Sequence, residues 1–230
     1  MSDAPKRFYE QVTEEPSGDG FVILLDGRPA KTRSGNSLVA VPPLVGALRD
    51  EWDAQGEFIR LETMPLSRIH GALVDSDDTA RVSWAETVLQ YAGRDLLCYR
   101  AEAAKLAARQ ETTFAPFMKL AAADGIALEM TSGILPIDQP AEALEAVKKK
   151  LDALSPADLF IRKLLTEMTG SAVLALYADR HPDEAFAAAR LDETVQAEQW
   201  GLDAEAEAKE KALRAEYDAA LQYLALQVSV

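Results

Sequence analysis

The chain has 230 residues, 48% of them hydrophobic and 27% charged, and it can bury a proper core as one large domain or two small ones. Its formal net charge of −14 at pH 7 repels phosphate backbones and anionic membrane surfaces, and the sequence contains no local basic patch. We therefore expect no nucleic-acid partner, whereas a basic protein partner fits this charge.

The cysteine content and the N-terminus bear on the compartment. Cys98 is the only cysteine, so no intramolecular disulfide can form and a reducing compartment is favoured. Residues 1–20 have neither the apolar core of a secretory signal nor the Arg-rich, acid-poor composition of a transit peptide. No apolar stretch reaches the ~18 residues that a membrane span needs. These features predict a protein of the cytoplasm, or else a mature organellar form, without insertion into a membrane.

The first third of the chain is predicted to be rich in β-structure. Asp26-Gly27 favours a tight hairpin turn because both residues tolerate positive φ, and SGNS at 34–37 favours a second turn. Pro29 places its strand at a sheet edge, and Pro42-Pro43 ends the β region. The expected strands are residues 8–13, 21–25, 28–32 and 38–41.

A helical period follows, since residues 44–52 carry an apolar side chain at every fourth position. We expect an extended stretch over 58–66 and then a helix over 78–93. DLLCYRA at 95–101 has the apolar run of a short buried strand. The predicted buried face of the helix consists of Val82, Ala85, Val88, Leu89 and Ala92.

From about residue 103 the chain is predicted to be almost entirely helical, with one extended interruption at 125–140. Ser155-Pro156 marks a helix start, because a capping hydroxyl precedes a proline in the first turn. Gly170 and Gly201 are expected to separate helices. The apolar stripe of the final helix consists of Leu213, Tyr217, Leu221, Leu224 and Val228.

Strands followed by helices indicate an α+β fold rather than a doubly wound α/β sheet. We predict a small N-terminal α+β domain with antiparallel strands over residues 1–100 and an all-helical C-terminal domain over 101–230. Nothing in the sequence demands an oligomer, so we expect a monomer when the protein is free.

The lone thiol of Cys98 raises the question of a nucleophile, which would need a low pKa from a histidine partner or a helix N-terminus. His70 and His181 are the only histidines, and neither lies in a nucleophile signature. Cys98 follows Leu96-Leu97, where a small buried residue is the commoner role. We interpret the thiol as structural. A soluble enzyme that uses Cys98 or a carboxylate pair stays open as an alternative.

Metal and nucleotide sites have no recognisable pattern in this sequence. One cysteine and two histidines are a poor supply of zinc ligands, and no stretch has the D-x-D-x-D-G spacing of a calcium loop. The P-loop, the dinucleotide fingerprint and the G-x-S-x-G elbow are absent as well. We therefore predict no metal, no cofactor and no catalytic residue.

Carboxylates are concentrated between Asp192 and Asp218, where nine acids stand against Lys209, Lys211 and Arg214. Such a run is usually a solvated helix face. The alternative is an acidic docking surface that steers and orients a basic partner. Taken alone, the charge pattern leaves both interpretations open.

Seven motifs occur in one order along the chain: RFY (7–9), LDGRPAKT (25–32), EWDAQ (51–55), MPLSR (64–68), DLLCYRA (95–101), TSGILPI (131–137) and LDETVQAEQWG (191–201). In this order they resemble the assembly chaperones of the F-type ATP synthase that escort the alpha subunit of the F1 head, the Atp-twelve family. The resemblance implies an α+β domain followed by a helical domain, without enzymatic activity or cofactor. It also implies one client, the free F1 alpha subunit, which is bound until the beta subunit replaces it. A bacterial cytoplasmic member is favoured over a mature mitochondrial matrix protein.

The resemblance also carries over to individual positions. Trp52 matches the tryptophan of the family's E-W-D motif and is expected to be structural. The acids after Leu191 match a carboxylate cluster that the family uses for function, so Asp192 and Glu193 are the expected client contacts. Glu198 ranks third, because it lies six residues from Asp192 and five from Glu193, well around a helix. The leading hypothesis is a client-specific chaperone, and a permanent subunit of a larger complex is a further alternative.

Overall fold

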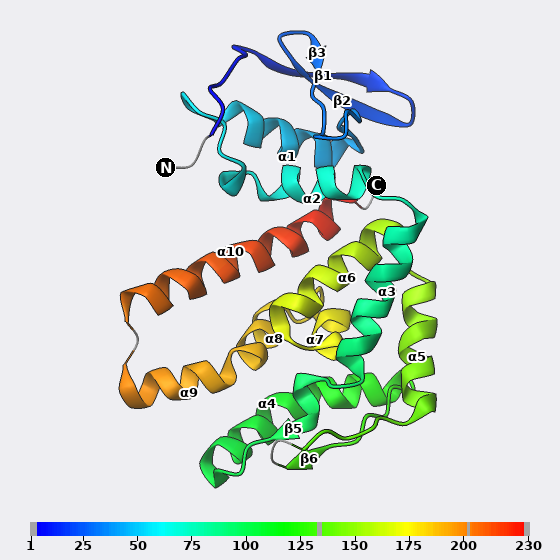
Figure 1. Cartoon of the computed structure of the whole chain (residues 1–230), viewed down its shortest axis with the longest axis vertical. Coiled ribbons are helices and arrows are strands. Elements are labelled where there is room, and N and C mark those ends of the chain that lie inside the picture. Colours follow the sequence, from blue (N-terminus) through cyan, green and yellow to red (C-terminus); the bar gives the residue numbers. More distant parts are fainter. Residues whose placement is uncertain (1–3, 133–134, 202, 228–230) are drawn as a thin grey trace. The chain divides into compact units, whose positions relative to one another are not determined.

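The computed structural model describes residues 4–132, 135–201 and 203–227 (Figure 1). Short strands near the N-terminus form an antiparallel sheet that packs against a helix, and helices make up most of the remaining chain. The predicted α+β fold class is therefore confirmed. Two sequence features, Val228 of the final apolar stripe and Gly133-Ile134 of the TSGILPI motif, lie outside the described residues.

The chain divides into two compact units. The first comprises Met1–Asp77 together with Gln222–Val230, and the second comprises Asp78–Leu221. The units part earlier in the chain than the boundary predicted after residue 100. That boundary, taken as the limit of an independently folding domain, stays a prediction.

The N-terminal sheet has four described strands, β1 (Val12–Ser17), β2 (Gly20–Leu25), β3 (Arg28–Pro29) and β4 (Val39–Ala40). Strand β2 pairs with each of the other three, and all three pairings are antiparallel, as predicted. Asp26 and Gly27 adopt φ angles of 48° and 75°, which confirms the tight turn between β2 and β3. The Asp26 carboxylate also accepts hydrogen bonds from the backbone N–H groups of Glu10 and Gln11.

The first strand was predicted over residues 8–13, and this is wrong for residues 8–11 because β1 begins at Val12. Tyr9 instead packs against α1 (Pro42–Asp53), where its hydroxyl donates to the carbonyl of Trp52 at 2.7 Å. Strand β1 is mostly exposed, whereas its partner β2 supplies the buried side chains. A polar edge strand has little hydrophobic pattern for a sequence prediction to use.

The extended stretch expected at 58–66 is also wrong in part, because α2 (Pro65–Val74) begins inside it. The carboxylate of Glu51, in α1, accepts hydrogen bonds from the N–H groups of Leu66 at 2.8 Å and Ser67 at 2.7 Å. These are orphan donors of the first turn of α2, so the side chain of Glu51 caps that helix. Since the cap comes from another helix, the local sequence gives no sign of it.

The end of α10 (Ala204–Gln227) belongs to the first unit. There the Tyr223 hydroxyl lies 2.8 Å from Nδ1 of His70, and Nε2 of His70 lies 3.0 Å from the carbonyl oxygen of Val39. A carbonyl can only accept, so Nε2 carries the hydrogen and Tyr223 donates to Nδ1. Burial lowers the pKa of His70 and favours this neutral form. The core of this unit includes Ile23, Leu44, Val45, Leu48 and Met64.

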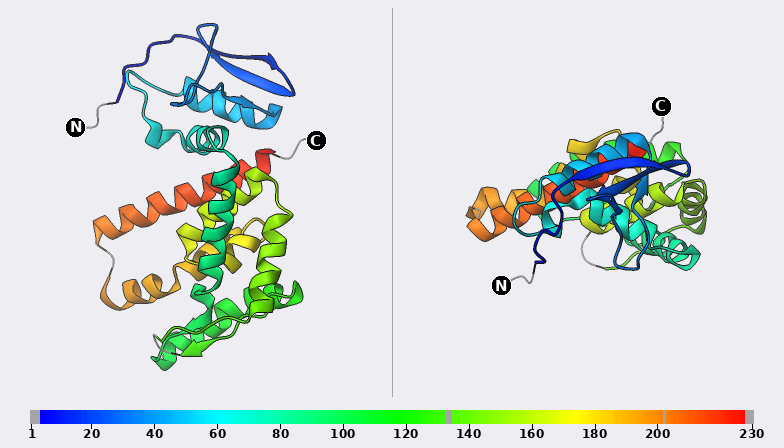
Figure 2. Two further views of the ribbon diagram at one scale, coloured as in Figure 1. Left: turned by 45° about the vertical axis from the view of Figure 1, so that its right-hand side comes forward. Right: turned by 90° about the horizontal axis from the view of Figure 1, so that it is seen from above.

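The second unit is mostly helical. Its described helices are α3 (Asp78–Ala92), α4 (Ala104–Ala123), α5 (Ala141–Asp152), α6 (Pro156–Thr169), α7 (Ala172–Tyr177), α8 (Pro182–Ala189), α9 (Leu191–Trp200) and the part of α10 before Gln222. Every residue of α7 is buried, and α7 packs against α3, α4, α6 and α8 (Figure 2). This short helix is therefore the centre of the unit's core.

Helix α3 confirms the helix expected over 78–93, but its buried face differs from the predicted one. Val88 and Ala92 are fully buried as predicted, whereas Val82 is 58% exposed. Trp84 takes the buried position instead, and its ring packs on that of Phe160 at 4.7 Å between centroids. The large apolar area of the indole sets which face of the helix turns inward.

The predicted strand over 95–101 is a 3₁₀ turn, Leu96–Cys98, followed by β5 (Tyr99–Arg100), so the prediction is wrong for its first part. Strand β5 pairs in parallel with β6 (Thr131–Ser132), which lies inside the excursion expected at 125–140. The turn forms because the buried carboxylate of Asp95 accepts the N–H of Leu97 at 3.0 Å. An acid inside an apolar run is the local signal that this segment is capped rather than extended.

The predicted helix boundaries in the second unit are confirmed. The Ser155 hydroxyl accepts the N–H of Asp158 and caps α6, and Gly170 ends α6 with a φ of 70°. Gly201, with a φ of 81°, follows α9.

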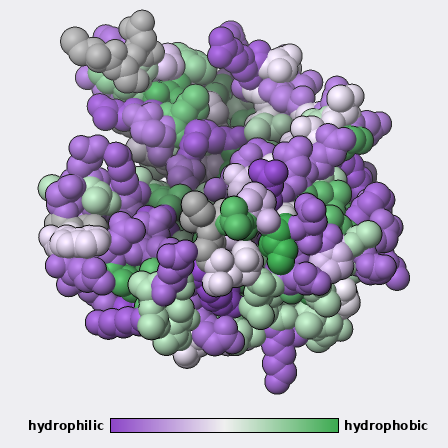
Figure 3. Space-filling view, turned by 60° about the horizontal axis from the view of Figure 1, so that its bottom comes forward, coloured by the Kyte–Doolittle hydropathy of each residue, from purple (hydrophilic) through white to green (hydrophobic). Residues whose placement is uncertain are grey.

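The face of the molecule in Figure 3 is mostly hydrophilic, with hydrophobic residues in small separate patches.

Candidate functional site

Asp192 lies half-buried in the first turn of α9, and a buried side chain from α4 holds it in place. Its Oδ1 accepts a hydrogen bond from Nε2 of Gln110 at 3.0 Å. Gln110 is only 3% exposed, and its Oε1 accepts the backbone N–H of Ala101 at 2.7 Å. The orientation of this carboxylate is therefore fixed by a chain of two hydrogen bonds.

Glu193 is exposed and forms an ion pair with Arg190, the residue before α9, at 2.7 Å. The Nε of the same guanidinium contacts Glu210 of α10 at 2.9 Å. One arginine thus joins α9 to α10. Partly exposed ion pairs each contribute about 0–1 kcal/mol to stability, so the main effect here is on the geometry of the carboxylates.

Glu198 also has a cationic partner, since its Oε2 lies 2.5 Å from Nη1 of Arg109 on α4. This hydrogen bond lowers the pKa of Glu198. Arg109 is the neighbour of Gln110, so Asp192 and Glu198 both contact α4. Glu193 is instead paired with Arg190, which also contacts α10. The three carboxylates chosen from the sequence therefore divide into two groups with different surroundings.

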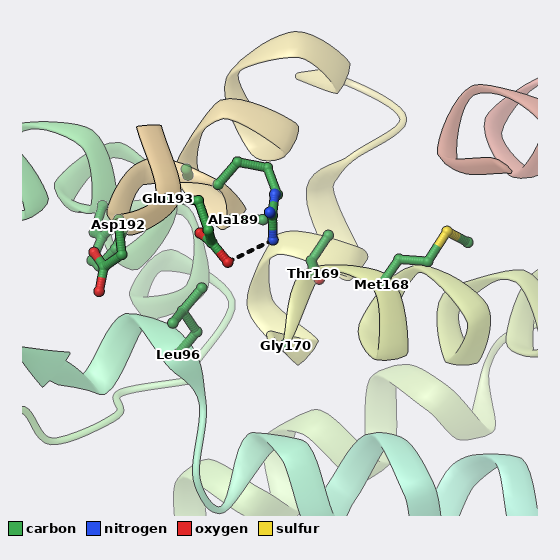
Figure 4. A pocket seen from close by; sticks show the side chains of 10 residues that line it. Leu96, Met168, Thr169, Gly170, Ala189, Asp192 and Glu193 are labelled. Atoms are coloured by element: carbon green, nitrogen blue, oxygen red, sulfur yellow. Dashed lines mark hydrogen bonds and ion pairs between the residues drawn. The ribbon is translucent and has the colours of Figure 1, made fainter. Parts of the chain in front are cut away.

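A cavity of about 290 Å³ lies beside the first turn of α9 (Figure 4). Asp192 and Glu193 both line it, and Figure 4 shows their carboxylates turned in different directions, with the Glu193–Arg190 ion pair as a dashed line. The remaining lining residues are Leu96, Phe114, Met168, Thr169, Gly170, Ala188, Ala189 and Arg190. This mixed lining suits a side chain that has an apolar stem and a cationic end.

Within the same unit, Cys98 is fully buried. Burial raises the pKa of its thiol to about 12, and the nearby charge of Asp95 adds to the effect. The thiolate is the reactive form of cysteine, so this thiol is poorly suited to act as a nucleophile at neutral pH. The geometry agrees with the structural interpretation of Cys98.

Neither a metal site nor a membrane-spanning helix has a candidate in the described part of the chain. Among residues 4–132, 135–201 and 203–227, no group of three or more His, Cys, Asp or Glu side chains could hold a metal ion. Nor does any helix within those ranges combine the length and the apolar character needed to cross a bilayer.

Trp52 lies where three of the sequence motifs meet, in the first unit. The Arg7 guanidinium donates to the carbonyl groups of Tyr9 and Asp53, each at 3.0 Å. The Tyr9 ring packs edge-to-face on the indole of Trp52, with 5.9 Å between centroids. Glu51, the residue before Trp52, caps α2. These contacts tie the N-terminal segment and α2 to the end of α1.

The family model described as ATP12 chaperone protein matches residues 6–122 of this chain. The chain belongs to the ATP12 chaperone family.

Two solved structures are similar to this chain over nearly its whole length. The crystal structure of Atp12 from Paracoccus denitrificans is 30% identical and covers 97% of this chain and 99% of its own, with a TM-score of 0.89. A candidate chaperone from Agrobacterium tumefaciens is 38% identical and covers 96% of this chain and 85% of its own, with a TM-score of 0.90. Both alignments are long enough to include most of the second unit, which carries the α9 carboxylates.

Sequence reasoning found carboxylates of this ATP12 family member but missed the residues that orient them: Arg109, Gln110 and Arg190. One signal was present for Gln110. It occupies the buried face of α4 with Phe114, Phe117 and Ala121, at helical spacing. A glutamine on an otherwise apolar face needs a polar partner, because its amide would be costly to bury without hydrogen bonds.

Proposed function

We propose that the protein is an assembly chaperone of the F1-ATPase. In this role it binds the free alpha subunit and prevents its aggregation until the beta subunit replaces it. The observation that carries the proposal is the similarity to Atp12 from Paracoccus denitrificans over 97% of this chain and 99% of that one. Both solved relatives come from bacteria, which supports a bacterial protein. We infer further that it acts in the cytoplasm and is a monomer when free, as the sequence led us to expect.

The carboxylates of α9 are the proposed client contacts in this role, with Asp192 and Glu193 first and Glu198 third. Each is held by a neighbouring side chain, namely Gln110, Arg190 and Arg109. A pre-oriented carboxylate loses less conformational entropy when it binds a guanidinium or ammonium group. The proposed mechanism is binding and release alone, with no catalytic step and no cofactor.

The charge of the whole chain also suits this role. A net charge of −14 raises the rate of encounter with a basic surface, while charged contacts at an exposed rim add little to the final affinity. A chaperone needs fast capture of an aggregating client and a complex that another subunit can take apart. Electrostatic steering supplies the first without opposing the second.

The test is gel filtration with light scattering on the purified chain mixed with freshly refolded alpha subunit, with and without beta subunit. We expect a one-to-one complex that dissociates when beta is added. Aggregation of alpha at the same rate with and without the chain would overturn the proposal. A complex that persists after beta is added would instead indicate a permanent subunit.

Charge-reversal variants test the proposed contacts. Asp192→Lys and Glu193→Lys put a positive charge opposite the client's cations, so each adds repulsion to the loss of a contact. Each should abolish protection of the alpha subunit and leave the circular dichroism spectrum unchanged. Asp192→Asn, by contrast, keeps the acceptor for Gln110 and removes only the charge. The matched control is Asp152→Lys, because Asp152 is an exposed carboxylate in an ion pair with Lys148 on α5. If the control and the α9 variants protect alpha equally well, these carboxylates do not contact the client.

A further inference from the structure

A second and larger cavity opens between α9 and the first turns of α10. Its volume is about 490 Å³, and we name it the α9–α10 groove. Helix α9 ends at Trp200 and α10 begins at Ala204, and residues of both helices line the groove. The groove is lined by Arg190, Glu193, Thr194, Gln196, Ala197, Trp200, Gly201, Asp203, Ala206 and Glu210.

Part of the groove lining consists of small residues. Ala197 on α9 and Ala206 on α10 contribute only a methyl group each, and Gly201 contributes no side chain. Trp200 lines the same groove and is 77% exposed, although an indole is among the largest apolar surfaces a residue can offer. Exposed tryptophans beside a pocket are typical of sites that dominate the energy of protein binding. The α9–α10 groove therefore has room for a guest side chain and an aromatic surface to pack it.

The charged residues of the groove indicate which guest would fit. Glu193, Asp203 and Glu210 contribute three carboxylates, and Arg190 contributes one guanidinium, so the lining carries two net negative charges. Arg190 is already paired with Glu193 at 2.7 Å and with Glu210 at 2.9 Å. The Asp203 carboxylate accepts the N–H of Ala206 at 2.8 Å at the start of α10. An incoming guanidinium or ammonium group would meet carboxylates that are held in place and in excess.

We propose that the α9–α10 groove binds an apolar side chain flanked by arginine or lysine on the client protein. This inference rests on the proposed function and names the part of the client that the chaperone contacts. Trp200 packs on the apolar side chain, and the carboxylates of Glu193, Asp203 and Glu210 bind the flanking cation. A second copy of this chain fits the groove poorly, because its own net charge of −14 brings like charges to an acidic rim.

Binding at this groove is tested by the dissociation constant for freshly refolded alpha subunit. Trp200→Ser should weaken binding at least tenfold, whereas Trp200→Phe keeps an aromatic surface and should weaken it less than threefold. Ala206→Phe fills the groove and should also weaken binding at least tenfold. The matched control is Val82→Ser, since Val82 is an exposed apolar residue of α3 in the same unit. All four variants should have wild-type circular dichroism spectra, because each changes an exposed or groove-lining side chain.

A photo-crosslinking amino acid at Gln196, which lines the groove, then identifies the guest directly. We expect crosslinks to a client segment in which an apolar residue lies within a few positions of arginine or lysine, and no crosslinks from the same amino acid at Val82. Crosslinks to an acidic client segment would overturn the charge argument.

The failures of the two proposals are distinguishable. If wild-type protein does not bind the alpha subunit, the proposed function fails and this inference fails with it. If wild type binds but Trp200→Ser and Ala206→Phe bind equally well, the groove is not the site and the proposed function stands. If wild type alone is a dimer in light scattering and Trp200→Ser is a monomer, a second copy occupies the groove, which also overturns the inference.

Discussion

Asp95 is the most deeply buried carboxyl group among the described residues, and its replacement by asparagine gives a sharp test of the energetics of the second unit. The side chain is fully buried. It accepts the N–H of Leu97 at 3.0 Å, the N–H of Val173 at 3.0 Å and the hydroxyl of Ser171 at 2.6 Å. The carboxylate thus connects the turn at Leu96–Cys98 to the start of α7, the helix at the centre of the core.

Two opposing effects set the protonation of this group. Burial raises the pKa of Asp95 from 3.8 to about 6, and the hydrogen bonds from Ser171, Val173 and Leu97 counteract part of that rise. Because the pKa is higher in the folded state, the folded protein binds the proton more tightly than the unfolded chain does. The resulting stability is fully present below pH 3.8 and is lost as the pH rises through about 6. By proton linkage the loss between pH 4.5 and pH 7.5 is about 2 kcal/mol.

Asp95→Asn removes the titration while keeping the shape of the side chain. Its amide NH₂ faces the N–H of Val173, which costs about 1–3 kcal/mol for the unsatisfied donors. Removal of the buried charge offsets this cost at pH 7.5, by about 3 kcal/mol. We therefore expect the unfolding free energy of the variant to be close to that of wild type at pH 7.5 and about 2 kcal/mol lower than that of wild type at pH 4.5.

The assay is urea unfolding of wild type and Asp95→Asn at pH 4.5 and pH 7.5, monitored by circular dichroism. The difference in unfolding free energy between the two proteins is then compared at the two pH values. Asp124→Asn is the control of opposite sign, because its hydrogen bond to Lys150 lowers the pKa of the Asp124 carboxyl. Wild type should lose stability relative to that control as the pH falls. A difference for Asp95→Asn that does not change with pH would show that the hydrogen bonds balance the effect of burial, and one that shrinks toward acid pH would show that they outweigh it.

Two substitutions test the structural roles assigned to other residues, with the same unfolding assay. Trp52→Ala removes the edge-to-face contact with Tyr9 and should lower the unfolding free energy by about 2–3 kcal/mol, less than for a fully buried tryptophan because Trp52 is half-buried. The exposed Trp200 provides the control, since Trp200→Ala should change the unfolding free energy by less than about 0.5 kcal/mol. Cys98→Ala should cost about 1 kcal/mol and leave protection of the alpha subunit at the wild-type level. Loss of protection in a folded Cys98→Ala protein would restore the thiol hypothesis.

The sequence predicted those elements whose causes are local. Ser155 and Gly170 begin and end α6 through short-range hydrogen bonds and a positive φ, and Asp26-Gly27 turns the chain by backbone conformation alone. Helix α2 was missed because its cap is the carboxylate of Glu51, in another helix. Such a contact appears only after the chain has folded.

The same distinction applies to the candidate site. The acids of α9 stand out by composition and by family resemblance, so Asp192, Glu193 and Glu198 could be chosen in advance. The orientation of Asp192 and Glu198 depends on Gln110 and Arg109, more than eighty residues earlier in the chain, whereas Glu193 is held by the nearby Arg190. Helical geometry treated Glu198 as remote from Asp192, yet the two contact adjacent residues of α4. Angular separation on one helix does not predict which neighbouring helix a long side chain reaches.

Each α9 carboxylate already has a partner, and this bears on how a client could be released. In the proposed function, a cation of the client would compete with Arg190 for Glu193 and with Arg109 for Glu198, and its donor would displace Gln110 from Asp192. The gain from each exchange is the difference between two similar interactions, and at an exposed surface that difference is small. In both proposals, the affinity would come from many weak exchanges together with apolar contacts such as those proposed for Trp200. A competing subunit that buries more apolar area can therefore displace the chaperone without first breaking any single strong bond.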